Sequence, residues 1–348
     1  MRTLKGLIER GQSPWYDNLS RGLIESGELS ALIEQGIVGV TSNPTIFDQA
    51  ISKSSDYDKA LAKCKSESKD AEQTYWDLVC TDISDAADLL RSTYDSTDGQ
   101  DGYVSVEVSP LLAHHTAETI AQANELYTRI GRENVMIKIP ATLEGIPAIE
   151  AVVANSIPVN VTLIFSQERY AQVIGAFKAG AQKADKVPAS VASFFISRLD
   201  SKVDKALSPD SKFRGKAAVA NAGIAYDMFE QQFANAKSVD GLQRPLWAST
   251  STKNPDYSTT LYVDELIAKN TVNTLPGATI AAIGTNEGDY PTSDLNDHLE
   301  DLKTAWKEII IQSPIDSIMK ELEDEGVSSF EASYQSCLES ISARLAQM

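Results

Sequence analysis

Short apolar segments alternate with longer amphipathic segments along most of the chain. The apolar segments predict strands at 14–17, 37–41, 103–108, 135–139, 158–165, 190–196, 246–249 and 279–283. Most of them are separated by segments with a helical pattern, such as 20–35, 116–130 and 167–184. Strands that alternate with helices favour parallel pairing, and eight such units predict an α/β fold of the closed (β/α)8 barrel, or TIM barrel, type.

Two segments exceed what this barrel requires. The segment 47–102 lies between the second and third predicted strands and is too long for one loop, so it predicts two or more additional helices. The segment of about 291–348 predicts helices packed on the barrel, in a position to cross one of its mouths. Because no linker divides the chain, we expect residues 1–348 to form one barrel domain.

A lysine interrupts the otherwise apolar strand at 135–139. Lys138 shares one face with Met136, while Val135, Ile137 and Ile139 share the other face. The apolar face suits the helix layer, which points Lys138 into the barrel. Burial disfavours the charged form of a lysine and makes its amine available as a nucleophile toward carbonyl compounds. The alternative is a lysine at a strand end that extends to water.

The strand at 158–165 carries polar residues on one face. Asn160 and Thr162 share that face with Ile164, and Leu163 belongs to the opposite, apolar face. A face this polar does not suit the helix layer, so we expect it to point into the barrel.

The same alternation places further polar side chains inside, near the carboxyl ends of their strands: Asn43, Glu107 and Ser193. Barrels of this type carry their chemistry at that end, so these side chains are expected to meet Lys138 there. Simpler alternatives remain. Asn43 is also suited to cap a helix that begins at Pro44, and Asp17 to cap the helix that follows it. Ser193 and Thr162 also suit ordinary barrel filling.

Composition excludes several classes of partner. The net charge of −18 disfavours binding to nucleic acids and to anionic membranes, so an anionic substrate requires a local basic pocket. The three cysteines have no metal-type spacing, and with the absence of an apolar leader they favour the cytoplasm. His114 and His115 diverge by about 100° on a helix, so we expect no metal site.

A buried lysine beside a carboxylate and a hydroxyl is suited to form an iminium with a ketone. Glu107 and Thr162 are candidates for the proton transfers, acting through a positioned water. Breaking a neighbouring carbon–carbon bond requires a second carboxylate, which takes a proton from the departing hydroxyl. Asp17, at the end of the first predicted strand, is the candidate.

Three segments carry a resemblance to a known family. GVTSNPTIF at 39–47, VMIKIPATLEGI at 135–146 and NVTLIFS at 160–166 resemble the signature segments of transaldolases. The resemblance extends from Trp15 to about Gly284 and is weak over the C-terminal helices. It implies an enzyme without cofactor that moves a dihydroxyacetone unit between sugar phosphates in the pentose phosphate pathway. A monomer or a homodimer is expected.

The resemblance also implies roles for individual residues. Lys138 resembles the Schiff-base lysine, Asp17 the acid/base aspartate, and Glu107 and Thr162 the pair that holds water. The implied substrate-binding residues are Asn43, Asn160, Ser193, Phe195, Arg198, Ser249 and Lys253. Arg198 would bind phosphate, whereas Lys253 stands near the place where many relatives carry a second phosphate-binding arginine. A lysine lacks the two-pronged geometry of arginine, so this substitution leaves the role of Lys253 open.

Two other functions are compatible with the same residues. A fructose 6-phosphate aldolase would release free dihydroxyacetone, but such enzymes carry tyrosine where this chain has Phe195. A barrel that has lost activity and serves as a scaffold is disfavoured, because the titratable groups are all retained.

Overall fold

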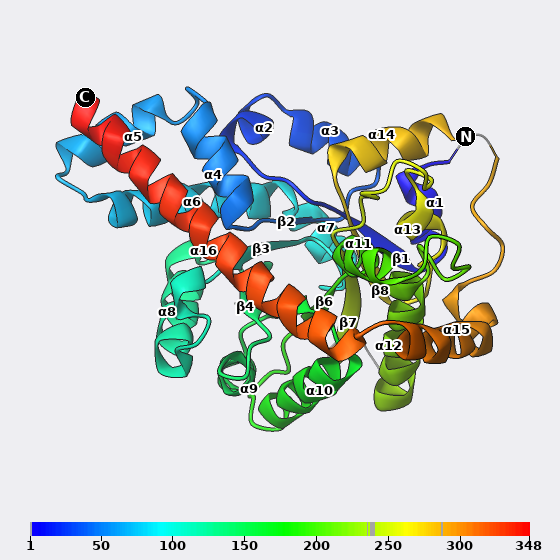
Figure 1. The fold of residues 1–348 in the computed structure, drawn as a ribbon. Coiled ribbons are helices and arrows are strands. Elements are labelled where there is room, and N and C mark those ends of the chain that lie inside the picture. The colour runs from blue at the N-terminus through cyan, green and yellow to red at the C-terminus, as the bar shows by residue number, and fades with distance from the viewer. Residues whose placement is uncertain (1, 235, 237–240, 287) are drawn as a thin grey trace.

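A computed structural model describes residues 2–234, 236, 241–286 and 288–348 of the chain (Figure 1). Eight parallel strands close into a barrel in the order in which they occur in the sequence. The strands are β1 Gln12–Tyr16, β2 Gly39–Thr41, β3 Tyr103–Glu107, β4 Val135–Pro140, β5 Val159–Ile164, β6 Ser190–Phe195, β7 Gln243–Ala248 and β8 Thr271–Leu275. The predicted (β/α)8 barrel is confirmed.

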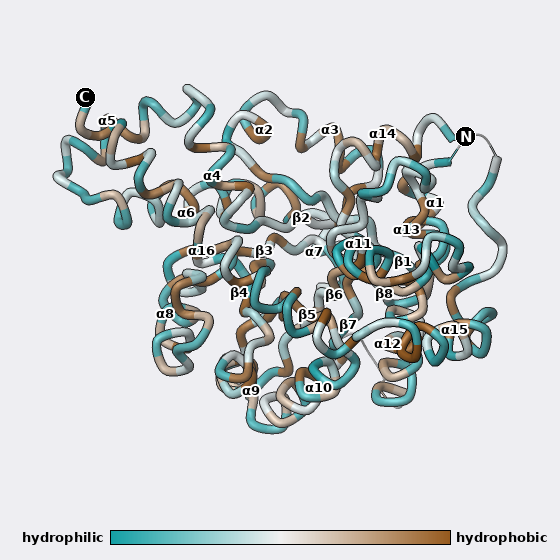
Figure 2. The backbone as a smooth tube through the Cα atoms, in the orientation of Figure 1, coloured by the Kyte–Doolittle hydropathy of each residue, from teal (hydrophilic) through white to brown (hydrophobic). Residues whose placement is uncertain are grey.

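Helices surround the barrel; the first precedes β1, and the others follow the strands in turn. They are α1 Leu4–Ile8, α2 Arg21–Glu25, α3 Glu28–Gln35, α8 Thr116–Ile130, α9 Gly145–Ala154, α10 Gln167–Ala181, α11 Ser197–Ala206, α12 Ala217–Phe233, α13 Leu261–Asp264 and α14 Gly277–Thr285. Two short 3₁₀ helices are also present, η1 Pro110–Leu112 and η2 Leu295–His298. Figure 2 shows apolar positions gathered on the strands and on α9, where the barrel and its helix layer share one core.

The eighth strand differs from the prediction. Residues 279–283 belong to helix α14, and the strand is Thr271–Leu275. A short apolar run fits a strand or a buried helix equally well, so the pattern favoured the wrong segment. The observed strand carries polar side chains, and backbone carbonyls of neighbouring segments accept hydrogen bonds from them. Asn273, for example, donates to the carbonyl of Tyr262 at 3.4 Å.

Four helices fill the segment between β2 and β3, as the length of that segment predicted. They are α4 Pro44–Lys53, α5 Asp58–Ser66, α6 Ala71–Leu89 and α7 Arg91–Ser96. The longest, α6, begins with a capping box in which Asp70 accepts from the backbone of Gln73 at 2.8 Å and the Gln73 side chain accepts in return.

The last helix, α16 Ile315–Gln347, crosses the carboxyl-terminal mouth of the barrel (Figure 1). It contacts α11 on one side of the mouth and α4, α5 and α6 on the other, and it touches β5 between them. The preceding helix, α15 Leu299–Gln312, packs instead on the outer helix α12, with Lys303 3.1 Å from Asp227. The predicted C-terminal helices are therefore present, and α16 is the one that crosses the mouth.

A buried arginine occupies the opposite, amino-terminal end of the barrel. Arg244 in β7 lies 3.1 Å from Asp101 and donates to the carbonyls of Gln100 at 2.8 Å and Thr271 at 3.0 Å. It also donates to the hydroxyl of Ser13 in β1, which donates in turn to Asp101 at 2.9 Å. These bonds link β7, β8 and β1 to the loop before β3 at the base of the barrel.

In the described part of the chain, no helix combines the length and the apolar character needed to cross a membrane.

Candidate active site

Lys138 points into the barrel from β4, as the alternation of its strand predicts. The strand is buried along its length, and Lys138 itself is only 5% exposed. Its amine donates to the carbonyl of Ser42 at 3.1 Å and lies 3.3 Å from Oε2 of Glu107. Glu107 and Asn160 are its direct neighbours in the register of β3 and β5. The lysine is therefore an interior group and does not extend to water.

Glu107 is a buried carboxylate, and its burial disfavours the charged form. Burial raises the pKa of Glu107, and the nearby Lys138 lowers it by a smaller amount. Oε2 of Glu107 is buried and lies 3.3 Å from the Lys138 amine without the geometry of a hydrogen bond, and Oγ1 of Thr162 is buried with no hydrogen-bond partner in the part of the chain that the structure describes. Two such atoms on the strands that flank Lys138 are suited to hold a small polar molecule beside its amine.

Asp17 approaches the same interior from β1. It follows the strand directly, and its backbone N–H donates to the carbonyl of Leu275 at 3.1 Å. Burial raises the pKa of its carboxyl group, while Lys138 and then Lys253 lower it. The next helix, α2, is capped by Ser20, which accepts from the backbone of Leu23 at 3.2 Å. Asp17 is thus not a helix cap, and its carboxylate is available to the interior.

A pocket of about 610 Å³ opens at this mouth of the barrel. Of the residues predicted for the site, it is lined by Asp17, Asn43, Lys138, Thr162, Ser193, Phe195, Arg198, Ser249 and Lys253. Glu107 and Asn160 are not part of this lining. These nine lining residues come from six of the eight strands or the segments directly after them, and Glu107 adds a seventh strand, β3.

Asn160 is fully buried, and both ends of its amide are engaged. Its nitrogen donates to the hydroxyl of Ser105 at 3.0 Å, and its oxygen accepts from Ser193 at 2.7 Å. This arrangement orients Ser193, which lines the pocket. A direct contact of Asn160 with substrate stays a prediction.

Asn43 caps a helix and also lines the pocket. Its side-chain oxygen accepts from the backbone of Ile46 at 3.0 Å, so it caps helix α4, whose first residue is Pro44. It also lines the pocket. The cap fixes its side chain at the mouth of the barrel.

Two cations, Arg198 and Lys253, line the pocket. The guanidinium of Arg198 lies over the ring of Phe195, 5.2 Å from its centre. Lys253 donates to Ser251 at 2.6 Å. Among the residues that the structure describes, neither cation forms an ion pair with a carboxylate. Burial lowers the pKa of both groups, and the proximity of Arg198 lowers that of Lys253 further. Their positive charges are suited to attract an anion to this pocket.

Ser249 fixes the start of the helix that carries Arg198. It follows β7 with a positive φ of 56°, in the left-handed region. Its carbonyl accepts from the backbone of Ser197 at 3.1 Å, and the two hydroxyls are 3.0 Å apart. Ser197 and Arg198 are the first residues of α11. The strained residue therefore helps to aim the arginine.

The regular alternation of β5 ends at Leu163, contrary to the prediction. Leu163 has a positive φ of 58°, and the register with β6 shifts between Val161 and Ile164. Ile164 pairs with Phe194, whose ring packs on Tyr170 of the outer helix α10. Ile164 thus belongs to the helix face, and Leu163 turns toward α16 instead. The bulge comes directly after Thr162.

Two contributors to the site have no clear signal in the sequence. The carbonyl of Ser42 accepts from Lys138, and backbone atoms leave no trace in a residue pattern. Phe330 of α16 lines the pocket, and its ring centre lies 5.8 Å from the amine of Lys138. Its spacing along α16 matches that of ordinary core residues.

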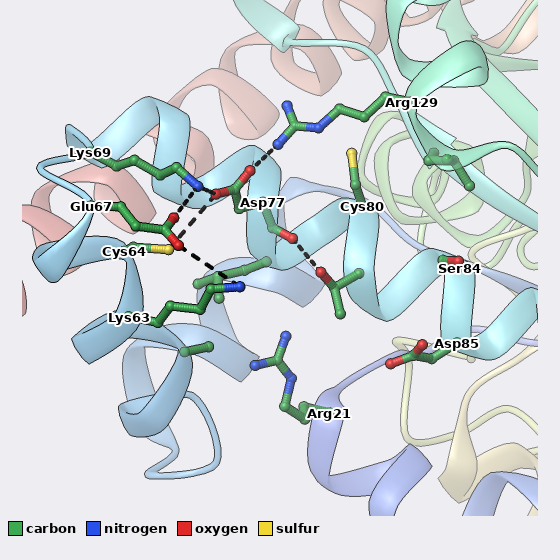
Figure 3. Close-up of a pocket in the computed structure, with 14 residues that line it drawn as sticks. Arg21, Lys63, Cys64, Glu67, Lys69, Asp77, Cys80, Ser84, Asp85 and Arg129 are labelled. Atoms are coloured by element: carbon green, nitrogen blue, oxygen red, sulfur yellow. Dashed lines mark hydrogen bonds and ion pairs between the residues drawn. The ribbon is translucent and has the colours of Figure 1, made fainter.

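A second cavity, of about 540 Å³, lies outside the barrel between α5 and α6 (Figure 3). It also holds cations, but carboxylates neutralise them. Asp77 pairs with Arg129 and with Lys69 at 2.5 Å. Burial raises the pKa of its Cys80 to about 11, so the thiol is inert. Among the described residues, no group of three or more His, Cys, Asp or Glu side chains could hold a metal ion. The barrel pocket is the better candidate for chemistry.

Comparison with known proteins supports this choice. The sequence profile of the family described as Transaldolase/Fructose-6-phosphate aldolase matches residues 14–341, and so includes most of α16. The chain is 44% identical to Transaldolase 2 of Streptomyces avermitilis, over 99% of this chain and 98% of that protein. It is 43% identical to a transaldolase of Saccharopolyspora erythraea, with 99% and 98% covered, and 42% identical to one of Mycolicibacterium smegmatis, with 98% and 97% covered. The chain therefore belongs to the transaldolase/fructose-6-phosphate aldolase family of enzymes.

Proposed function

We propose that the protein is a transaldolase that works through a Schiff base on Lys138. It transfers a dihydroxyacetone unit from a ketose phosphate, sedoheptulose 7-phosphate or fructose 6-phosphate, to an aldose phosphate, glyceraldehyde 3-phosphate or erythrose 4-phosphate. The observation that carries this proposal is one buried amine with two buried carboxylates near it: Glu107 lies 3.3 Å from the amine, and Asp17 lines the same pocket and interacts electrostatically with Lys138.

Imine formation uses the β3 side of the pocket. The amine of Lys138 adds to the ketone carbon, and the resulting carbinolamine loses water to give the iminium. Oε2 of Glu107 lies 3.3 Å from the amine, and this carboxylate together with the hydroxyl of Thr162 is suited to hold the water that leaves. Glu107 supplies and removes the protons of this step.

Carbon–carbon cleavage uses the β1 side. The iminium accepts the electron pair of the bond between C3 and C4, and an enamine forms on Lys138. The proton of the C4 hydroxyl moves to the Asp17 carboxylate, and the aldose phosphate leaves. Burial raises the pKa of Asp17, which makes its carboxylate a stronger base for this proton than an exposed aspartate. The second aldose reverses the step: the enamine carbon attacks its aldehyde carbon, and Asp17 returns the proton to the new hydroxyl.

Substrate binding uses the two unpaired cations and the hydroxyl and amide groups. Arg198 and Lys253 both line the pocket, are close enough for their charges to interact, and suit the phosphate of either sugar. Asn43 and Ser193 line the part of the pocket that holds Lys138 and are suited to bind hydroxyls of the covalent fragment. The protein as a whole carries a net charge of −18, so these local cations are needed to hold an anion.

The proposal places the enzyme in the non-oxidative pentose phosphate pathway and in the cytoplasm. Its three cysteines are free and buried, which fits a reducing compartment.

One coupled assay tests the function against its nearest competitor. Fructose 6-phosphate is supplied with and without erythrose 4-phosphate, and both glyceraldehyde 3-phosphate and free dihydroxyacetone are measured. A transaldolase gives sustained turnover that depends on the acceptor. Release of dihydroxyacetone at the same rate without acceptor identifies an aldolase instead. Absence of both reactions with these and the seven-carbon donor contradicts the proposal.

A further inference from the structure

We infer that Phe330 of α16 is a specificity-determining residue, which keeps water from the three-carbon unit on Lys138 and so favours transfer over hydrolysis. The inference rests on the proposed Schiff-base function. It concerns a residue outside the barrel strands and the loops that follow them, on a helix whose seat over the mouth is built by specific contacts.

The ring of Phe330 is part of the wall beside the reactive amine. Its centre lies 5.8 Å from the amine of Lys138, and the side chain is only 4% exposed. Two other groups beside this amine, the Ser42 carbonyl and Glu107, are polar and attract water. Phe330 contributes apolar surface to the surroundings of Lys138.

A close approach of α16 to β5 sets the depth of the ring. Gly326 lies one helical turn before Phe330, on the same face. A Cβ atom at Gly326 would come within 2.8 Å of Cδ2 of Leu163. Leu163 is the residue with positive φ at the bulge, so its departure from the regular strand is what directs its side chain to α16. The strained residue after Thr162 therefore seats the helix that carries Phe330.

Polar contacts hold the helix on both sides of this point. Glu325 binds Lys202 of α11 at 2.7 Å, and Glu323 lies 3.3 Å from Arg169 of α10. On the other side, Ser333 lies 2.8 Å from the hydroxyl of Thr45 in α4. The ring is consequently held over the pocket from both ends of the segment 323–333.

Access of water to Lys138 decides whether the three-carbon unit is transferred or released as dihydroxyacetone. After cleavage, an enamine of three carbons remains on Lys138. Transfer joins its nucleophilic carbon to the acceptor aldehyde. Hydrolysis instead protonates that carbon to give an iminium. The oxygen of a water then bonds to the imine carbon, the bond from carbon to nitrogen breaks, and dihydroxyacetone leaves as the amine is restored. A transferase must limit water to the one molecule that imine formation releases and imine hydrolysis consumes.

The test compares turnover without and with acceptor in Phe330→Ala, Phe330→Leu and a control. Fructose 6-phosphate is the donor, erythrose 4-phosphate is the acceptor, and a coupling enzyme removes glyceraldehyde 3-phosphate. Steady turnover without acceptor measures hydrolysis, and free dihydroxyacetone verifies it. Lys320→Ala is the matched control, because Lys320 lies on the same helix, is exposed and pairs only with Asp324 in the described part of the chain.

In Phe330→Ala, the ratio of hydrolysis to transfer should rise about tenfold, with a smaller rise in Phe330→Leu. Lys320→Ala should keep the wild-type ratio. A general loss of structure lowers both rates and does not raise this ratio. If the Phe330 variants fold, transfer the unit and keep the wild-type ratio, the inference is wrong. Failure of the proposed function looks different, because wild-type protein would then form no adduct at Lys138 that borohydride traps.

Discussion

Arg244 and Arg198 lie at opposite ends of the same barrel, Arg244 near the start of β7 and Arg198 just beyond the end of β6. Arg244 is 4% exposed, pairs with Asp101 at 3.1 Å and donates to two carbonyls and a hydroxyl. Arg198 shares its pocket with Lys253, and neither forms an ion pair with a carboxylate within the described residues. The first end uses buried charge to hold the fold, and the second keeps charge available for a ligand.

The same contrast applies to the carboxylates. Asp101 at the base accepts from Arg244 and Ser13. Asp17 at the mouth makes no side-chain hydrogen bond to the residues that the structure describes, and burial raises its pKa. Unsatisfied groups cost stability, so their concentration at one end of the barrel indicates where function outweighs stability. Barrels of this class carry their chemistry at that end.

The largest expected effect divides the work of the two carboxylates at the mouth. Asp17→Asn should stop transfer while the intact six-carbon ketose can still be trapped at Lys138 by borohydride, because the iminium forms but its bond cannot break. Glu107→Gln should instead slow the trapping itself. Each loss should be roughly 10²–10⁴-fold, typical of a missing general acid or base. Accumulation of the six-carbon adduct in Glu107→Gln, with no adduct in Asp17→Asn, would reverse the two assignments.

Removing the arginine at the base should reduce stability and leave chemistry nearly intact. Arg244→Met leaves Asp101 buried without its cation, which should cost about 3–5 kcal/mol in the free energy of unfolding, measured by urea denaturation. The double variant Arg244→Met with Asp101→Asn is the control and should recover part of this loss. A lower kcat at temperatures where the single variant is folded would show that Arg244 also serves catalysis. That result would contradict the division between a structural base and a functional mouth.

Removing the arginine at the mouth should do the opposite. Arg198→Ala should lower kcat/KM for fructose 6-phosphate by roughly 10- to 100-fold, equivalent to the loss of about 1.5–3 kcal/mol from a charge-assisted phosphate contact. Unphosphorylated fructose should lose much less, and the unfolding free energy should change little. Lys253→Ala should show the same selectivity with a smaller loss. Equal losses for both donors would exclude a phosphate role for Arg198.

The smallest expected effect is that of Asp17 on the free energy of unfolding. The pKa of Asp17 is raised in the folded protein, so its charge opposes folding at neutral and higher pH. Asp17→Asn should therefore raise stability at pH 8 by about 1 kcal/mol. The gain should shrink as pH falls through the raised pKa, because the wild-type carboxyl then protonates and loses its penalty. Thermal melts of both proteins across this range check the sign; a gain that grows on acidification would contradict it.

The fold was predictable where the strands are apolar and regular. Lys138 could be assigned to the interior because both flanking positions in β4 are apolar and the alternation holds. The eighth strand was missed because its partners are backbone groups such as the Tyr262 carbonyl, which a hydropathy pattern does not contain. The predicted seventh strand began at Leu246, two residues too late to include Arg244.

The site was predictable as far as the alternation reached. Thr162 lines the pocket as expected, but one residue later the bulge at Leu163 reverses the pattern. No local signal marks that bulge, since a leucine with positive φ is held there by its contact with Gly326 in a helix far along the chain. Phe330 was missed for the same reason, because its place over Lys138 follows from how α16 packs and not from its own sequence.

The most direct test of the account is the identity of the residue that borohydride labels in the presence of fructose 6-phosphate. The account predicts a three-carbon unit attached to Lys138, located by mass spectrometry of peptides, with loss of activity in proportion to labelling. Lys138→Ala should show neither label nor turnover. A label on any other lysine, or full transfer activity in Lys138→Ala, would contradict the assignment of Lys138 as the nucleophile.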